Sequence, residues 1–123
     1  MKKIIALIVS ILTCFETQGQ LAPIKDSVLA SDGKYLEVDV YRPVGCSQCP
    51  TILIQTPYGK FWYPIIGLPL GIKYNINNSN YNFVVADWRG FYANAADAYS
   101  GMPSHGKDGK DIVQWIAAQS WSD

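Results

Sequence analysis

The chain has 123 residues, of which 49% are hydrophobic, and its ten Lys and Arg residues balance its ten Asp and Glu residues. This composition is typical of a globular chain and excludes a disordered tail. Because the net charge is zero and no basic run follows Lys2 and Lys3, the chain lacks the positive surface that holds a nucleic-acid backbone. Nucleic acid is therefore not expected as a partner.

The beginning of the chain predicts a secretory signal peptide over residues 1–19. Two lysines precede an apolar run over residues 4–15, and polar residues follow it, which is the order of regions in such a peptide. The run is shorter than the roughly 20 apolar residues of a membrane span. Lipid attachment at Cys14 ranks second, because Thr13 is bulkier than the small residue that usually precedes a modified cysteine. Either route exports the protein to the periplasm or the extracellular space and leaves residues 20–123 as the folded part.

The folded part is predicted to begin with two antiparallel strands. Residues 35–41 alternate between apolar and polar side chains, as a half-buried strand does. Asp32-Gly33 directly before them favours a tight hairpin turn, so residues 27–30 are expected to form the partner strand. We expect this pair at one edge of a sheet.

Two further strands are predicted over residues 51–56 and 82–87. Both are short, continuous apolar runs with β-branched residues, a pattern that favours strands buried on both faces. Part of the aromatic and Pro/Gly/Asn-rich stretch 61–81 is expected to form a crossover helix. An antiparallel pair followed by buried strands with crossovers predicts the opening half of an α/β sheet, in which the pairing changes from antiparallel to mostly parallel. Further strands are expected to be missing from the chain.

A helix is predicted over residues 108–119, after a long loop over residues 91–106. Ile112 and Ile116 are spaced four residues apart, which places them on one apolar helix face. Asp108 is expected to cap the helix, since a short carboxylate suits the positive end of the helix dipole.

The cysteines at 46 and 49 have the spacing of a redox motif or of half a zinc site. A redox pair would open a helix, whereas Cys46 and Cys49 stand between prolines in a strand connection. A zinc ion would need further ligands that the sequence does not offer nearby. A local disulfide is therefore our first interpretation for an exported protein.

Four short motifs follow one another along the chain: Ser31-Asp32-Gly33 with Leu36-Glu37-Val38-Asp39-Val40-Tyr41-Arg42-Pro43, then Thr56-Pro57-Tyr58-Gly59-Lys60, Asp87-Trp88-Arg89-Gly90, and residues 109–123. In this order they resemble the N-terminal part of the cocaine esterase and X-Pro dipeptidyl-peptidase (CocE/NonD) family of serine α/β-hydrolases. The resemblance implies the N-terminal half of an α/β-hydrolase fold. It also implies acyl transfer to water through an acyl-serine intermediate, a small acyl ester or peptide-like substrate, and no cofactor or metal.

Tyr58 is the candidate catalytic residue that the resemblance supplies. The family places a tyrosine at this point of its Pro-Tyr motif, where the hydroxyl donates a hydrogen bond to the oxyanion of the tetrahedral intermediate. Such donors stabilise charge that develops only in the transition state. The alternative is that the Tyr58 ring only packs beneath a loop.

The resemblance places the nucleophile elbow, a G-x-S-x-G turn, just after Trp121-Ser122-Asp123. We therefore expect the chain to be truncated before the triad and to be inert by itself. His105 is the only histidine, and we interpret it as a loop residue, because adjacent residues cannot supply triad geometry. Asp87 and Arg89 are expected to form a structural ion pair that fixes the following loop.

Two other functions stay open at this point. The chain could be a non-catalytic secreted binding module, or a degenerate relative expressed without its triad. Reading the nucleotide sequence beyond Asp123 distinguishes them, because a continuing frame with a nucleophile elbow supports the enzyme.

Overall fold

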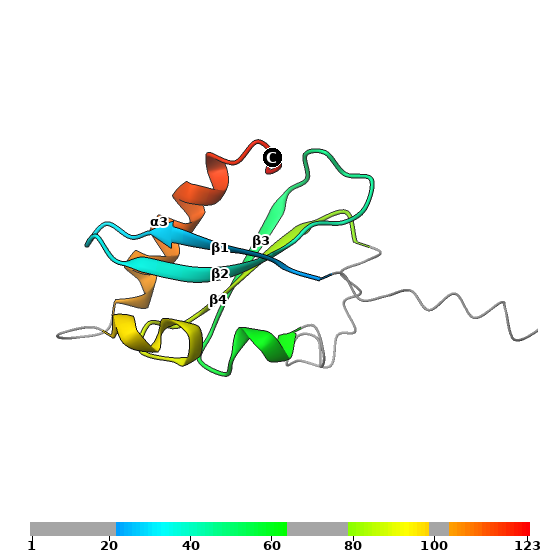
Figure 1. Cartoon of the computed structure of the whole chain (residues 1–123). Helices are drawn as coiled ribbons and strands as arrows, with labels where there is room; N and C mark the ends of the chain where they lie inside the picture. The colour runs from blue at the N-terminus through cyan, green and yellow to red at the C-terminus, as the bar shows by residue number, and fades with distance from the viewer. Residues whose placement is uncertain (1–21, 64–78, 99–103) are drawn as a thin grey trace, which may run out of the picture.

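A computed structural model describes residues 22–63, 79–98 and 104–123 (Figure 1). The predicted signal peptide and the greater part of the predicted crossover helix lie outside these residues. Within them, no helix is long and apolar enough to cross a membrane.

The described residues form a four-stranded mixed sheet. Its strands are β1 (Ile24–Leu29), β2 (Tyr35–Tyr41), β3 (Thr51–Thr56) and β4 (Asn82–Asp87), in the spatial order β1-β2-β4-β3. β1 pairs with β2 and β2 with β4 in antiparallel fashion, whereas β3 and β4 are parallel. All four predicted strands and the change from antiparallel to parallel pairing are confirmed.

The burial of the two parallel strands differs from the prediction in one case. β4 is buried at every residue, as expected for a strand between two neighbours. β3 is only half-buried along its whole length, because it is the outer strand of the described sheet. The expectation of burial on both faces was therefore wrong for residues 51–56.

Each face of the sheet carries its own apolar cluster, since side chains alternate along a strand. Helix α3 (His105–Ala117) covers one face with Ile112 and Ile116, as the four-residue spacing predicted (Figure 1). The residues of the sheet in that cluster are Val28, Ala30, Leu36, Val38, Val40, Val84 and Ala86. The opposite face buries Tyr41, Tyr63, Phe83 and Val85.

Helix α3 begins three residues earlier than predicted, at His105. The carbonyl of Ser104 accepts hydrogen bonds from the amides of Lys107 and Asp108 at the start of the helix. Asp108 is thus inside the first turn and is not the capping residue. Its carboxylate instead accepts hydrogen bonds from the guanidinium of Arg89.

Two short 3₁₀ helices lie at the end of the sheet where β3 and β4 finish (Figure 1). These are η1 (Lys60–Trp62) and η3 (Tyr92–Asp97), and the rings of Phe61 and Tyr92 contact each other with centroids 5.8 Å apart. The predicted loop over residues 91–106 was therefore wrong in two places, since it contains η3 and the first residues of α3.

Cys46 and Cys49 form the local disulfide that was our first interpretation. Cys49 also pairs with the end of the chain: its amide donates to the carbonyl of Trp121, and its carbonyl accepts from the amide of Asp123. This is a parallel bridge between Cys49 and Ser122. The connection before β3 and the segment after α3 therefore lie side by side.

Candidate active site

The candidate site is the loop over residues 57–60, here called the Tyr58 loop, which follows directly on β3. Tyr58 is 74% exposed, so no loop among the described residues covers its ring. The Tyr58 amide donates to the hydroxyl of Thr56, with 3.0 Å between nitrogen and Oγ1. The loop therefore turns at the end of the strand and leaves the tyrosine exposed. It lies at the carboxyl end of the parallel strands, where ligands bind in α/β proteins.

Lys60 ends this loop and is turned into the protein. Only 6% of the residue is exposed, and Nζ lies 2.7 Å from Oδ1 of Asp39 on β2. Lys25, whose side chain is largely exposed, stands further off at 4.0 Å from the same oxygen. The ion pair of Lys60 and Asp39 thus fixes the side chain at the end of the Tyr58 loop. The same carboxylate also affects Tyr41: burial, together with the charge of Asp39 and the neighbouring Tyr63, raises the pKa of Tyr41 to about 12.

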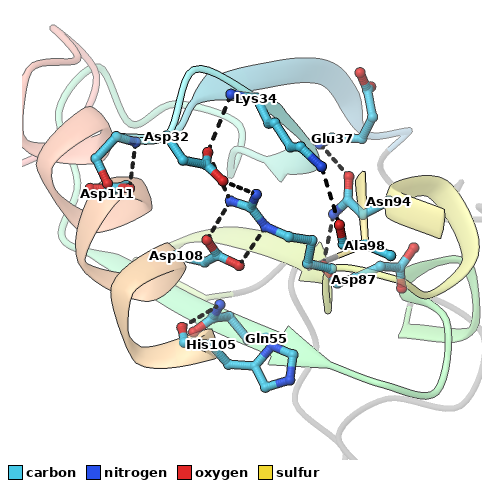
Figure 2. Close-up of polar contacts among 12 residues, drawn as sticks. Asp32, Lys34, Glu37, Gln55, Asp87, Asn94, Ala98, His105, Asp108 and Asp111 are labelled. Atoms are coloured by element: carbon cyan, nitrogen blue, oxygen red, sulfur yellow. Dashed lines mark hydrogen bonds and ion pairs between the residues drawn. The ribbon is translucent and has the colours of Figure 1, made fainter. Parts of the chain in front are cut away.

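Asp87, the last residue of β4, joins the Tyr58 loop to η3. Its Oδ1 accepts from the Lys60 amide at 2.6 Å, and its Oδ2 accepts from the Ala93 amide at 3.3 Å. Burial raises the pKa of Asp87, although both amides and the Lys60 ammonium act in the opposite direction. The residue's main-chain carbonyl accepts from Nδ2 of Asn94 at 2.7 Å, and Asn94 Oδ1 accepts from the Glu37 amide (Figure 2).

Aromatic rings stand beside the Tyr58 loop on η1 and η3. Phe61 and Trp62 are about half-exposed and contact each other with centroids 4.8 Å apart. Tyr92, which meets Phe61 edge-on, has a φ of 42°, a left-handed conformation that few non-glycine residues adopt. The rings of Phe61, Trp62 and Tyr92 therefore form one exposed aromatic cluster, which begins three residues after Tyr58 in the chain.

Arg89 and Asp87 do not form the predicted ion pair, because the guanidinium faces two other carboxylates. Figure 2 shows Asp32, from the turn between β1 and β2, and Asp108, from helix α3, both directed at it. Nη1 lies 2.5 Å from Asp32, and Nε and Nη2 contact the two oxygens of Asp108 at 3.1 Å and 2.6 Å. The arginine therefore ties the turn and the helix to the end of β4.

Hydrogen bonds between Arg89 and its carboxylates determine the direction of the pKa shifts of Asp32 and Arg89. The hydrogen bond from Arg89 lowers the pKa of Asp32. Burial alone would lower the pKa of Arg89, but the hydrogen bonds to Asp108 and Asp32 outweigh it and raise that pKa. Charge-assisted bonds of a planar guanidinium thus dominate over desolvation here.

His105 starts helix α3 and is not a loop residue as predicted. Its ring stacks on the Trp88 ring, with centroids 4.2 Å apart and planes inclined by 21°. Its carbonyl accepts from the Gln55 side chain at 3.3 Å (Figure 2). The histidine therefore helps to seat the start of the helix against the ends of β3 and β4. Among the described residues, no group of three or more His, Cys, Asp or Glu side chains is placed to hold a metal ion.

Comparison with known proteins assigns the chain to a family. A sequence model of the X-Pro dipeptidyl-peptidase (S15) family matches residues 32–123. The chain belongs to this family. The resemblance drawn from the four motifs is thereby confirmed, and the matched part contains the Tyr58 loop together with Asp39, Asp87 and Arg89.

Two individual proteins show the same relationship. The cocaine esterase of Rhodococcus sp. (strain MB1 Bresler) is 29% identical over 92 residues, which are 75% of this chain and 16% of the esterase. A crystal structure of a CocE/NonD family hydrolase from Staphylococcus aureus matches 80% of this chain and 20% of its own, with a TM-score of 0.55 and 21% identity. The second likeness is one of fold, and this S15-family chain spans only a small part of either protein.

Sequence reasoning missed several residues that shape the site of this S15-family chain. Lys60 stands in a quoted motif but received no role, because a lysine is almost never fully buried unless it is paired. Asp39 was placed on the polar face of its strand, yet it is 3% exposed. Asn94 is fully buried and carried no recognisable signal, because its value lies in the main-chain groups that it contacts.

Proposed function

We propose that this chain is the section of a serine α/β-hydrolase that supplies the oxyanion donor Tyr58, within the N-terminal half of that fold. The complete enzyme cleaves acyl esters or X-Pro peptide bonds through an acyl-serine intermediate. The family assignment supports the reaction class. The observation that carries the proposal is the exposed position of Tyr58 just after the end of β3, two residues before a buried and fixed Lys60.

The proposed chemistry assigns one task to this section. When the serine of the complete enzyme attacks the substrate carbonyl, negative charge moves to the carbonyl oxygen, and the Tyr58 hydroxyl donates a hydrogen bond to it. This interaction is stronger in the transition state than with the neutral carbonyl, so it lowers the activation barrier more than it tightens substrate binding. The nucleophile, base and acid come from other parts of the complete enzyme.

Replacing Tyr58 with Phe in the complete hydrolase tests this role. We expect kcat on an activated acyl ester to fall about tenfold to a thousandfold with little change in KM, because the ring stays and only the donor is lost. Tyr81→Phe is the matched control: Tyr81 is also exposed but precedes β4, at the opposite end of the sheet, so kcat should not change. Full turnover of the Tyr58 variant would refute the assignment.

The proposal extends to export and to the activity of the chain alone. We propose that residues 1–19 direct secretion and are then removed, and that the 123-residue chain hydrolyses activated esters no faster than buffer. Mass spectrometry of secreted protein checks the first point. Hydrolysis that a serine-directed phosphonate abolishes would contradict the second, since it would require a complete triad in this chain.

A further inference from the structure

The hydrogen bonds of Asp87 hold the loop that carries Tyr58, in addition to stabilising the end of β4. The residue is 3% exposed, and its two carboxylate oxygens accept from amides of two separate segments, Lys60 in the Tyr58 loop and Ala93 in η3. A single buried side chain therefore sets the distance between these segments. Both segments carry an exposed tyrosine, Tyr58 in the loop and Tyr92 in η3.

Lys60 transmits this constraint toward Tyr58. Its amide is held by Asp87 at 2.6 Å and its ammonium by Asp39 at 2.7 Å, so neither its main chain nor its side chain is free to shift. Gly59 alone separates Lys60 from Tyr58. It has a φ of 92°, and a Cβ there would lie 2.7 Å from the Phe61 ring. The joint is therefore tightly packed, and a displacement of Lys60 must displace Tyr58.

We infer that Asp87 is a positioning residue for Tyr58, acting through the Lys60 amide on the placement of the oxyanion donor. The inference rests on the proposed function of Tyr58. It follows from the demand for accuracy at such a site, where a misplacement of about 1 Å can cost on the order of a hundredfold in rate. A carboxylate suits this task because it offers acceptors to both amides, whereas an asparagine offers one acceptor and a competing donor.

A double-mutant cycle in the complete hydrolase tests the inference. Asp87→Asn, Tyr58→Phe and the double variant are compared by kcat and KM on an activated acyl ester, per folded molecule. We expect Asp87→Asn to lower kcat by about tenfold or more with KM changed less than about threefold. In the Tyr58→Phe background the same change should cost less than about threefold, because the donor that it positions is already gone.

Asp108→Asn is the matched control, because Asp108 is an equally buried carboxylate at 4% exposure that contacts Arg89 and not the Tyr58 loop. It should lower stability and leave kcat per folded molecule unchanged. An equal loss of kcat in this control would show that Asp87 matters only for folding. An equal loss from Asp87→Asn in both backgrounds would overturn the inference and leave the role of Tyr58 standing, whereas an inert Tyr58→Phe would remove both.

A second variant covers the case in which Asp87→Asn does not fold. Gly59→Ala disturbs the joint between Lys60 and Tyr58 without touching the buried carboxylate, since the added Cβ meets the Phe61 ring. Its loss of kcat should likewise shrink in the Tyr58→Phe background. An undiminished loss there, or full turnover of Gly59→Ala alone, would show that Tyr58 does not depend on the anchored Lys60.

Discussion

Lys60 and Arg89 are both buried cations at the end of the sheet where β3 and β4 finish, but the carboxylates around them are bound differently. Around Lys60, main-chain amides bind one of the carboxylates, whereas around Arg89 the guanidinium binds both. The Lys60 ammonium contacts Asp39, while the nearby Asp87 receives amides from Lys60 and Ala93. Arg89 contacts Asp32 and Asp108 directly with its own nitrogens.

The difference shows in the pKa values of the two carboxylates. That of Asp87 is raised, because burial outweighs the amides and the nearby ammonium. That of Asp32 is lowered, because the guanidinium donates to it directly. Asp87 is buried and bound mainly by main-chain amides, so its carboxylate is costly to ionise, whereas Asp32 is about half-exposed and bound to a guanidinium, so its carboxylate is not. The first arrangement is suited to shaping a loop and the second to joining elements.

The largest effect is expected for Arg89→Met, which removes the cation between two carboxylates. Asp108 would stay buried without the guanidinium charge, and breaking comparable buried ion pairs costs about 3–5 kcal/mol. Urea unfolding of the complete protein, followed by tryptophan fluorescence, measures the loss. The double variant Arg89→Met with Asp108→Leu should recover part of it. If the single variant unfolded at the midpoint of the unchanged protein, Arg89 would not join the helix to the strand.

A smaller loss is expected for Lys60→Met, at or below about 3 kcal/mol, because Lys25 can approach Asp39 from the exposed side. The Lys60 amide and its bond to Asp87 survive this change. Stability should therefore fall while kcat per folded molecule stays within about threefold, in contrast to Asp87→Asn. The same urea and kinetic measurements check both parts. A collapse of kcat here would mean that the ammonium, and not the amide, positions the loop.

The smallest expected effect is on the pH dependence of stability. The contribution of Asp32 is complete above its unfolded pKa of 3.8 and is lost as the pH falls through its lowered folded value. Asp87 has the opposite sign: ionising it costs nothing below 3.8, and the cost grows as the pH rises through its raised folded value.

Urea midpoints of variants between about pH 3 and pH 7 separate the two carboxylates. Asp32→Asn should flatten the loss of stability in acid. Asp87→Asn should remove the loss that accompanies rising pH, so that its midpoint increases with pH more steeply than that of the unchanged protein. Parallel profiles for all three proteins would contradict the opposite shifts.

The strands and the buried face of α3 could be predicted from local patterns, because alternation and four-residue spacing are set by the strand and helix themselves. The half-burial of β3 could not be predicted in this way, since it depends on a strand order in which β4 lies between β2 and β3. Asp108 was expected to cap its helix because a short carboxylate suits a helix start. Its tertiary partner Arg89 lies 19 positions earlier in the chain, and no local rule pairs them.

The candidate site was predictable in part. Tyr58 came from the resemblance to a family, and the structure adds its exposure. The surrounding contacts of Lys60, Asp39 and Asp87 join strands β2 and β4, the Tyr58 loop and η3. They depend on which carboxylate faces which cation once the sheet has formed, and several carboxylates were equally plausible from spacing alone.

The strand order has a consequence for how the chain is made. β4 is synthesised after β3, yet it occupies the place between β2 and β3. The hairpin of β1 and β2 can therefore pair as soon as it emerges from the ribosome, whereas β3 has no partner among these strands until Asp87 has also emerged. During that interval an apolar, β-branched strand is exposed along both edges, a state prone to aggregation. We therefore expect slower translation between residues 57 and 87 to lower the fraction of nascent protein that reaches its native sheet.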